Sequence, residues 1–486
     1  MDTITFTSKP NILGNILVRL LSFAILVFLA RFAYFLTVRT NSCPSTDLCF
    51  FSSVHQTLAV STTAAAAALD GGDAATSGAH LRNYYSSVFH DLIAEGYLSP
   101  GSKALCIETL AGNDVAALIE IGVSDSVGIS ENPSAPLVLY GRPVKQPFDN
   151  NTFDFEFSGI SGLDRSTEPA KFASEASRTL KPAGFFVVHT AAKDAYSLHS
   201  LLNLFDFCTL IRSREIDGIR EIVLQKVNGK QHFSGISVNK CSVPGYKHEL
   251  IRNAEPLIKE EPLKPWITFK KNLRNIRHLP DMVDISFRNR YVYVDVARNY
   301  GSSIGGWFKN QYPKQNKAFD VYAIEADKAF QEEYRSKKGV SLLPYVAWVR
   351  NETLFFGISR KPIGKNEERS RGVGRVQAVQ SSSSFADDLD RIDGFDFASW
   401  LKGVVSERDY VVVKMDVEGS EFYLVPRLVE TGAICLIDEI FLKCHYNRWQ
   451  RCCPGERSMK YQKTYARCLE LFSSLRGSGV LVHQWW

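Results

Sequence analysis

The chain has 486 residues, too many for one ordinary hydrophobic core, and at about 150 residues per domain this length favours two or three domains. Its composition, 45% hydrophobic and 22% charged residues, is typical of globular rather than disordered proteins. The net charge of +5 is too small to indicate nucleic-acid binding, and no basic stripe is interleaved with aromatic residues, so no nucleic-acid partner is expected.

A long apolar segment, Ile12 to Val38, lies near the N-terminus. At 1.5 Å per residue it is long enough to cross about 30 Å of hydrocarbon. Arg19 and Arg31 interrupt it, but arginines near the ends of a span can extend to the interface. The segment predicts a single transmembrane helix within an N-terminal anchor, residues 1–40. An organelle transit peptide and a cleaved signal peptide are the alternatives.

A linker follows the apolar segment. Ser61 to His80 is rich in Ala, Gly, Ser and Thr and has almost no large apolar residue, so residues 41–80 are predicted to form a flexible stalk. Basic residues lie on both sides of the span, Lys9 and Arg19 before and Arg31 and Arg39 after, so they leave both orientations open. A short tail before one span suits a signal anchor with the bulk of the chain in the lumen of the Golgi or the endoplasmic reticulum. Two glycosylation sequons, Asn150–Thr152 and Asn351–Thr353, are compatible with that location.

The first globular region is predicted over residues 81–227. Short apolar runs alternate there with segments of helical spacing, such as Asn113 to Gly122, and the second helix is expected to stop at Pro182. Such alternation indicates βαβ units and a parallel sheet. The predicted strands are residues 104–109, 126–130, 153–159 and 185–190.

Two motifs of this region, QPFDNNTFDFEFSGI and EASRTLKPAGFFVVHT, resemble the middle of class I S-adenosylmethionine-dependent methyltransferases. Those enzymes hold the cofactor in an E-x-G-x-G-x-G turn, whereas the turn here keeps only Gly112 and has Leu110 where the backbone must approach the ligand. Ser130 replaces the carboxylate that usually binds the ribose, and Glu131 should point the other way. The region is therefore predicted to be a degenerate methyltransferase-like scaffold without cofactor; an active domain with an unusual turn is the alternative.

Residues 228–285 read as a linker. They are rich in Lys, Pro and Glu and have isolated apolar residues without a clear period, with one helix predicted over Ile267 to Ile276.

The second globular region is predicted over residues 286–486. A strand, YVYVDV, carries Asp295 at its end, a turn reaches Gly301, and a helix follows. The next strand ends in Glu325 and Asp327. Strand, loop, helix, strand and acid form the mononucleotide-binding arrangement, in which the second carboxylate accepts the ribose hydroxyls. Asp295, Gly301, Glu325 and Asp327 are therefore the predicted cofactor-binding residues.

Farther along, the stretch VVVKMDVEGSEFYLVP runs from a buried strand into Asp416, Glu418 and Glu421. A structural role would have Asp416 cap the following helix, with the two glutamates near its positive end. A catalytic role is the alternative, because clustered carboxylates raise one another's pKa and make a better base. Asp416 and Glu418 are predicted catalytic residues, together with His445 at the end of the next strand.

The octet K-x-D-V-E-G-x-E and its place after strand, acid and helix resemble the FkbM family of methyltransferases over Tyr291 to Tyr446. The whole chain also resembles a group of plant membrane-anchored methyltransferase-like proteins. The resemblance implies S-adenosyl-L-methionine as cofactor and O-methylation of a sugar or similar hydroxyl in a glycan or small molecule. One departure is the first glycine of the family's D-x-G-A-x-x-G turn, which is Ala297 here.

The predicted fold is thus α/β, with two Rossmann-like domains of the class I methyltransferase type in tandem after one N-terminal transmembrane helix. The alternative function is a catalytically inactive scaffold or interaction protein. A glycosyltransferase is disfavoured, because Asp387 and Asp388 lie in a polar segment rather than after a strand. Cys444 and His445, with Cys452 and Cys453, fit no common zinc spacing, so disulfides are expected and no metal site is predicted.

Overall fold

The computed structural model describes residues 74–109, 111–134, 136–160, 162–227, 243–296, 301–360, 372–377, 390–450, 453 and 455–485. The predicted membrane anchor lies outside these residues, as does most of the predicted stalk. Helix α3 (Ala74–Ala94) begins within the segment assigned to the stalk. Across the described part of the chain, no helix combines the length and apolar character that crossing a membrane requires.

The first region contains a seven-stranded sheet in the order β3-β2-β1-β4-β5-β7-β6. Its first five strands pair in parallel, and β7 runs antiparallel to both β5 and β6. The strands are β1 (Ala104–Ile107), β2 (Ser126–Ser130), β3 (Val138–Tyr140), β4 (Phe153–Ser158), β5 (Leu180–Thr190), β6 (Cys208–Ile216) and β7 (Ile219–Lys226). The helices are α3, α4 (Asn113–Glu120), the 3-10 helix η1 (Leu163–Arg165), α5 (Pro169–Thr179) and α6 (Ala195–Leu202).

Both faces of this sheet are buried, as parallel sheets require. Alternation along β1 sends Leu105 into a core with Phe172 of α5, and Cys106 into a second core with Phe89 of α3. Tight packing also explains Gly184, where an added Cβ would lie 2.8 Å from the Asp154 carbonyl oxygen. The mixed α/β class with parallel strands, predicted from the alternating pattern, is confirmed.

Three short helices occupy the segment between the two sheets: α7 (Gly245–Asn253), α8 (Pro265–Asn272) and α9 (Leu279–Met282). The helix expected over Ile267 to Ile276 corresponds to α8, which begins at Pro265. Proline is favoured in the first turn of a helix because its missing N–H has no intrahelical partner there.

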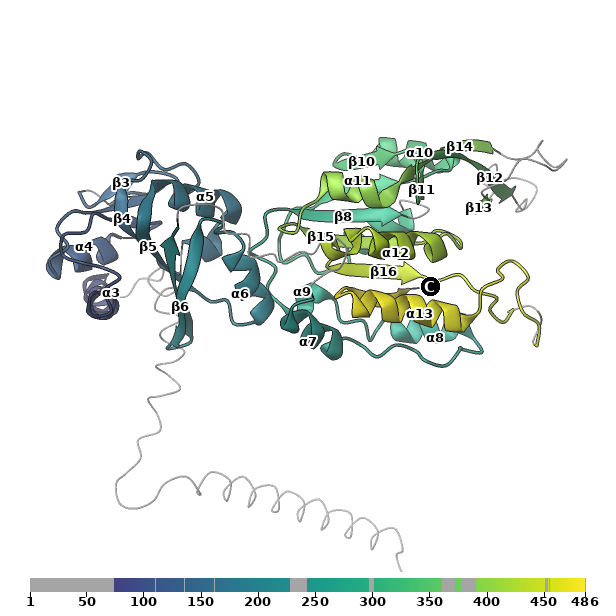
Figure 1. Cartoon of the computed structure of the whole chain (residues 1–486), viewed down its shortest axis with the longest axis horizontal. Helices are drawn as coiled ribbons and strands as arrows, with labels where there is room; N and C mark the ends of the chain where they lie inside the picture. The colour runs from purple at the N-terminus through teal and green to yellow at the C-terminus, as the bar shows by residue number, and fades with distance from the viewer. Residues whose placement is uncertain are drawn as a thin grey trace, which may run out of the picture. The chain divides into compact units, whose positions relative to one another are not determined.

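The second region contains a six-stranded, fully parallel sheet in the order β10-β9-β8-β15-β16-β17. The strands of this sheet labelled in Figure 1, β10, β8, β15 and β16, follow this order from top to bottom. Its strands are β8 (Tyr291–Val296), β9 (Asp320–Ile324), β10 (Val340–Leu343), β15 (Tyr410–Met415), β16 (Glu439–Lys443) and β17 (Leu481–Trp485). Its helices are the π-helix η2 (Gly301–Phe308), α10 (Lys328–Arg335), α11 (Phe397–Val404), α12 (Glu421–Glu430), the 3-10 helix η4 (Ala433–Leu436) and α13 (Tyr465–Gly477).

A small four-stranded sheet, in the order β11-β14-β12-β13, is inserted between β10 and β15 in the sequence. Its strands are β11 (Val346–Trp348), β12 (Glu352–Arg360), β13 (Gly372–Gln377) and β14 (Asp390–Asp396). The sequence predicted a polar loop over residues 366–388, and β13 corrects this prediction. Cross-strand pairing with β12 places this short segment in the sheet despite its polar character.

The strand order of the second sheet reverses beside β8. The chain proceeds outward from β8 to β9 and β10, and later places β15 on the other side of β8. Asp295 and Lys414 are register partners across this junction. In open α/β sheets, ligands bind at the carboxyl ends of the strands at such a switch point. The fold therefore defines where a site is expected before any side chain is considered.

A buried ionic network ties the linking segment to the second sheet. His483 on β17 is fully buried, with Nδ1 2.7 Å from an oxygen of Glu255 and Nε2 2.8 Å from an oxygen of Glu439. Burial acts to lower the pKa of His483, but the two carboxylates outweigh it and raise this pKa to about 9. The single positive charge of the imidazolium thus pairs with carboxylates from two distant parts of the chain.

We expect His483→Gln to lower the free energy of unfolding by about 3–5 kcal/mol near pH 6.5, because it leaves two buried carboxylates without a cation. Since the folded pKa of His483 lies above its ordinary value of 6.5, the contribution is fully present below about pH 6.5 and is lost as pH rises through about 9. Urea unfolding of the purified chain at pH 6.5 and 9.5 measures this. An equal gap between wild type and variant at both pH values would contradict the assignment.

Candidate active site

The parallel pairing of the second sheet brings the predicted site residues to one edge. Asp295 lies at the end of β8, Glu325 directly follows β9, and Asp416 directly follows β15. The backbone N–H of Asp416 donates to the carbonyl of Val296 at 2.9 Å, which continues the β8–β15 ladder beyond the last strand residue. His445 follows β16, the next strand of the sheet.

Asp295 is completely buried beside the switch point. Among the residues that the structure describes, neither of its carboxylate oxygens has a hydrogen-bond partner. Burial raises its pKa, and the positive charge of Lys414 and the nearby Ser303 hydroxyl act in the opposite direction. The Lys414 ammonium itself donates to the Ser303 hydroxyl at 2.6 Å. Asp295 therefore keeps acceptor capacity at the position where a ligand is expected.

Glu325 and Asp327 form a compact turn after β9. One carboxylate oxygen of Glu325 accepts the backbone N–H of Asp327 at 2.8 Å, and both residues are buried. Gly301 is the first residue of η2. Residues 297–300, which include the departure from the D-x-G-A-x-x-G pattern, lie outside the described residues. The structure thus places Glu325 and Asp327 at the carboxyl end of β9, and their contact with a ribose stays a prediction.

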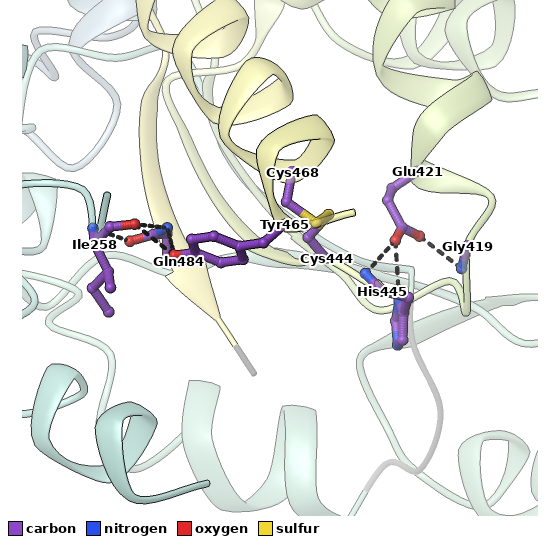
Figure 2. Close-up of a disulfide and its surroundings, with 8 residues drawn as sticks. All are labelled: Ile258, Gly419, Glu421, Cys444, His445, Tyr465, Cys468 and Gln484. Carbon is purple, nitrogen blue, oxygen red and sulfur yellow. Dashed lines mark hydrogen bonds and ion pairs between the residues drawn. A yellow bond between two sulfur atoms is a disulfide. The ribbon is translucent and has the colours of Figure 1, made fainter. Parts of the chain in front are cut away.

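A second group of acids, Glu421 with its neighbours, surrounds His445. One carboxylate oxygen of Glu421 accepts the backbone N–H of His445 at 2.6 Å and lies 3.2 Å from its Nδ1 atom. The other oxygen accepts the backbone N–H of Gly419 at 2.8 Å (Figure 2). Glu421 is fully buried in the first turn of α12, so it fixes both the main chain and the ring of His445.

Asp416 does not cap α12, which corrects the structural role considered from the sequence. The N-cap is Ser420, and no side chain there makes a capping hydrogen bond. Asp416 instead pairs with Lys443, whose Nζ lies 2.9 Å from Oδ2, and its Oδ1 lies 3.2 Å from Nε2 of His445. Charged partners on the neighbouring strand attract the carboxylate more strongly than the helix terminus does.

Glu418 faces the same cluster from an unusual backbone conformation. Its φ of 53° is left-handed and is followed by Gly419 at a φ of 108°, a sequence that turns the chain sharply before α12. Lys460 lies 2.6 Å from a carboxylate oxygen of Glu418, which also accepts the hydroxyl of Tyr461. The same oxygen is 4.0 Å from Nε2 of His445.

The electrostatics of the cluster differ from the sequence-based expectation that the acids would raise one another's pKa. Although burial acts to raise it, His445 and Lys443 hold the pKa of Asp416 well below its usual range. Burial likewise acts to lower the pKa of His445, but Asp416 and Glu421 raise it to about 9. Opposite charges outweigh the mutual repulsion of the carboxylates, so Asp416 orients groups better than it accepts protons.

A disulfide holds the strand end that carries His445. Cys444 is bonded to Cys468 of α13, 24 residues later (Figure 2). The sequence predicted disulfides here, but its spacing gave no indication of Cys468 as the partner. The sequence also did not identify three residues that contact the cluster, Lys443, Lys460 and Tyr461. Lys443 directly follows the apolar run Ile440–Leu442 at the end of β16, which is a usable signal, whereas the other two lie between β16 and α13 outside any helix or strand.

In the corresponding turn of the first sheet, Thr109 bonds to neighbouring groups, whereas one buried oxygen of Glu108 has no hydrogen-bond partner among the described residues. The Thr109 hydroxyl accepts the backbone N–H of Gly112 at 3.0 Å and donates to Asp114 at 2.5 Å. Glu131 is exposed and paired with Arg142 at 3.0 Å. His189 contacts Tyr84 and Glu221 in the core, as expected for a structural residue. The loss of cofactor from this region stays a prediction, and Leu110 lies outside the described residues.

A surface hollow lies on the exposed side of α12. The buried side of that helix carries Glu421, Leu424, Val425 and Leu428. The hollow is therefore separated from the His445 cluster by the body of the helix. It is lined by Val349, Arg350, Phe422, Tyr423, Pro426, Arg427 and Glu430.

Comparison with known proteins gives a family match for the second region. Residues 251–353 and 372–486 match the model of a domain of unknown function, DUF7870. Among curated proteins, none matches the sequence.

Several solved structures are similar to part of the chain. A S-adenosylmethionine-dependent methyltransferase from Aquifex aeolicus is 18% identical, with a TM-score of 0.25, over 29% of this chain and 89% of that one. The 1,6-didemethyltoxoflavin-N1-methyltransferase of Burkholderia thailandensis, solved with S-adenosylhomocysteine, is 15% identical, with a TM-score of 0.27, over 38% of this chain and 94% of that one.

The Cys444–Cys468 bond generates a stability prediction. Replacing both cysteines by serine should lower the free energy of unfolding by about 3 kcal/mol, the usual effect of releasing a loop of this size in the unfolded chain. Either single replacement should lower it about as much as the pair, because both remove the same bond. Urea unfolding of the three variants, with and without reductant, is the measurement. Single effects that sum to the double effect would show that no such bond forms.

Proposed function

We propose that the second region binds S-adenosyl-L-methionine at the carboxyl ends of β8 and β9 and methylates the hydroxyl of a sugar or similar acceptor. The observation that carries this proposal is the buried carboxylate of Asp295, which has no hydrogen-bond partner among the described residues at the topological switch point. A buried acid in that state favours a ligand that brings hydrogen-bond donors or positive charge. FkbM-type chemistry, suggested by the octet Lys414–Glu421, is part of this proposal.

The residues at the edge suit such a cofactor. Glu325, after β9, is in the position from which a carboxylate accepts both ribose hydroxyls. Asp295 lies at the end of β8, and η2, which begins at Gly301, is the next element in the chain. When bound, the cofactor supplies an electrophilic methyl group on a sulfonium. These residues bind and orient it, and Asp327 completes the turn that holds Glu325.

The acceptor side of the site is the cluster after β15 and β16. Methyl transfer exchanges an S–C bond for an O–C bond and releases the hydroxyl proton, so the acceptor oxygen must be oriented and made more nucleophilic. Asp416 and Glu418 accept hydrogen bonds, and His445 is fixed in place by Glu421. We assign orientation of the acceptor hydroxyl to Asp416 and Glu418, with His445 between them.

We extend the proposal to the whole chain. The two α/β sheets are tandem Rossmann-like domains, of which the first, residues 81–227, serves as a scaffold; its internally bonded Thr109 turn supports that role. A single-pass anchor in residues 1–40 holds the chain to a Golgi or endoplasmic reticulum membrane, as in plant proteins of this type. The Cys444–Cys468 disulfide supports a lumenal location, because such bonds persist in oxidising compartments.

Calorimetric titration with S-adenosylhomocysteine tests the cofactor site. Glu325→Gln should weaken binding about tenfold or more, the loss expected when a charged hydrogen-bond acceptor becomes neutral. Glu131→Gln is the matched control, because Glu131 follows the equivalent strand of the first sheet, and it should leave binding unchanged. Absence of both heat and thermal shift with the wild-type chain would favour the inactive scaffold.

A further inference from the structure

We propose that Asp416, Glu418 and His445 bind a divalent cation at the carboxyl ends of β15 and β16. One ligand atom from each of the three side chains lies within 4.8 Å of the other two. The three residues come from two neighbouring strand ends, so the sheet itself holds them together. The catalytic role of the ion rests on the proposed methyl transfer, whereas ion binding itself is argued from the geometry alone.

The distances between the ligand atoms also allow one bound cation. Nε2 of His445 lies 3.2 Å from Oδ1 of Asp416 and 4.0 Å from an oxygen of Glu418. Ligand atoms bound at about 2.1 Å are separated by about 3.0 Å in adjacent octahedral positions and about 4.2 Å in opposite ones. The first separation is close to that of adjacent positions. The second lies near that of opposite positions and joins His445 to the Glu418 oxygen that also contacts Lys460 and Tyr461, so a bound ion would share or replace those contacts.

His445 is prepared for coordination through Nε2. The residue is only 6% exposed, and the Nε2 atom has no hydrogen-bond partner of acceptable geometry, although it points at Asp416. Its other ring nitrogen, Nδ1, lies 3.2 Å from Glu421 (Figure 2). Histidines that bind metals usually donate the second ring N–H to a carboxylate in this way, which directs the lone pair of the first nitrogen at the ion.

The charges around the cluster leave room for a cation. Lys443 approaches Oδ2 of Asp416, so Oδ1, which also lacks a hydrogen-bond partner, still faces His445. When an ion displaces the Nε2 proton of His445, the ring is neutral, and the carboxylates of Asp416, Glu418 and Glu421 exceed the ammonium groups of Lys443 and Lys460 by one negative charge. A divalent ion changes the net charge of the cluster to one positive charge. The oxygen of a deprotonated acceptor hydroxyl would neutralise that charge. Mixed carboxylate and imidazole ligands suit Mn²⁺ or Zn²⁺.

A cation at this position favours one class of acceptor for the proposed reaction, namely a molecule with two neighbouring hydroxyl groups. Three protein ligands leave further coordination positions open, and Asp416 is 22% exposed, so a ligand can approach from solvent. Two neighbouring oxygens of a vicinal diol, as in a carbohydrate, can occupy two such positions. The ion lowers the pKa of a hydroxyl bound to it, and the proton leaves to solvent. Asp416, Glu418 and His445 are then metal ligands, and Glu421 is a positioning residue.

Mn²⁺ titration of the metal-free purified chain, read by electron paramagnetic resonance, tests the site without cofactor or acceptor. We expect one bound ion, with affinity at least tenfold weaker in Asp416→Asn and in His445→Gln. His189→Gln is the matched control, because His189 is a buried histidine beside a glutamate in the first sheet, and its affinity should not change. Failure of wild type to bind Mn²⁺ or Zn²⁺, or unchanged binding in both ligand variants, would overturn the proposal.

Two further variants separate coordination from a merely structural role. Glu421→Gln should weaken Mn²⁺ binding about 10–100-fold, as loss of a partner behind a metal-bound histidine does. Lys443→Met should instead strengthen binding severalfold, because it removes a positive charge beside Asp416. A structural cluster predicts weakening or no effect for Lys443→Met, and that result would count against the site.

The metal and cofactor experiments fail independently. Mn²⁺ binding in a chain that does not bind S-adenosylhomocysteine would keep the cation site and remove the methyl-transfer reaction. Cofactor binding without Mn²⁺ or Zn²⁺ binding would keep the proposed function and remove the cation.

Discussion

Parallel pairing of β8, β15 and β16 is the constraint on which the site depends. Each strand contributes residues to the site only at or after its carboxyl end, since the earlier positions of β8 and β15 are buried against helices or the aromatic core. Register then decides which side chains meet: Lys414 lies opposite Asp295, and Lys443 approaches Asp416. A shift of one residue would exchange the faces of the strand and separate every one of these pairs.

Charge neutralisation is the second condition that the fold meets. Isolated buried carboxylates are too costly to keep ionised, so a cluster such as that around His445 persists only with cations beside it. Lys443 comes from the neighbouring strand, and Lys460 from the irregular segment after it. The Cys444–Cys468 bond restrains the same segment, so the covalent link and the ion pairs hold one strand end together.

Local sequence features predicted the sheets well, because burial on both faces of a parallel strand leaves continuous apolar runs such as Tyr291–Val296. The same logic placed Asp295, Glu325 and Asp416 at strand ends. It could not assign their partners. Whether Asp416 caps α12 or pairs with Lys443 depends on distances across the sheet, and neither helical nor strand periodicity encodes them. Cys468 and Tyr461 were missed for the same reason.

The two sheets show how one architecture can hold different polar groups at the same strand end. In the first, the Thr109 hydroxyl bonds to Gly112 and Asp114 after β1, and one buried oxygen of Glu108 has no hydrogen-bond partner among the described residues. In the second, Asp295 at the end of β8 is fully buried, and both of its carboxylate oxygens lack a hydrogen-bond partner among the described residues. The larger unmet hydrogen-bonding capacity at Asp295, rather than the shared fold, therefore distinguishes the second region as the one better suited to bind a ligand.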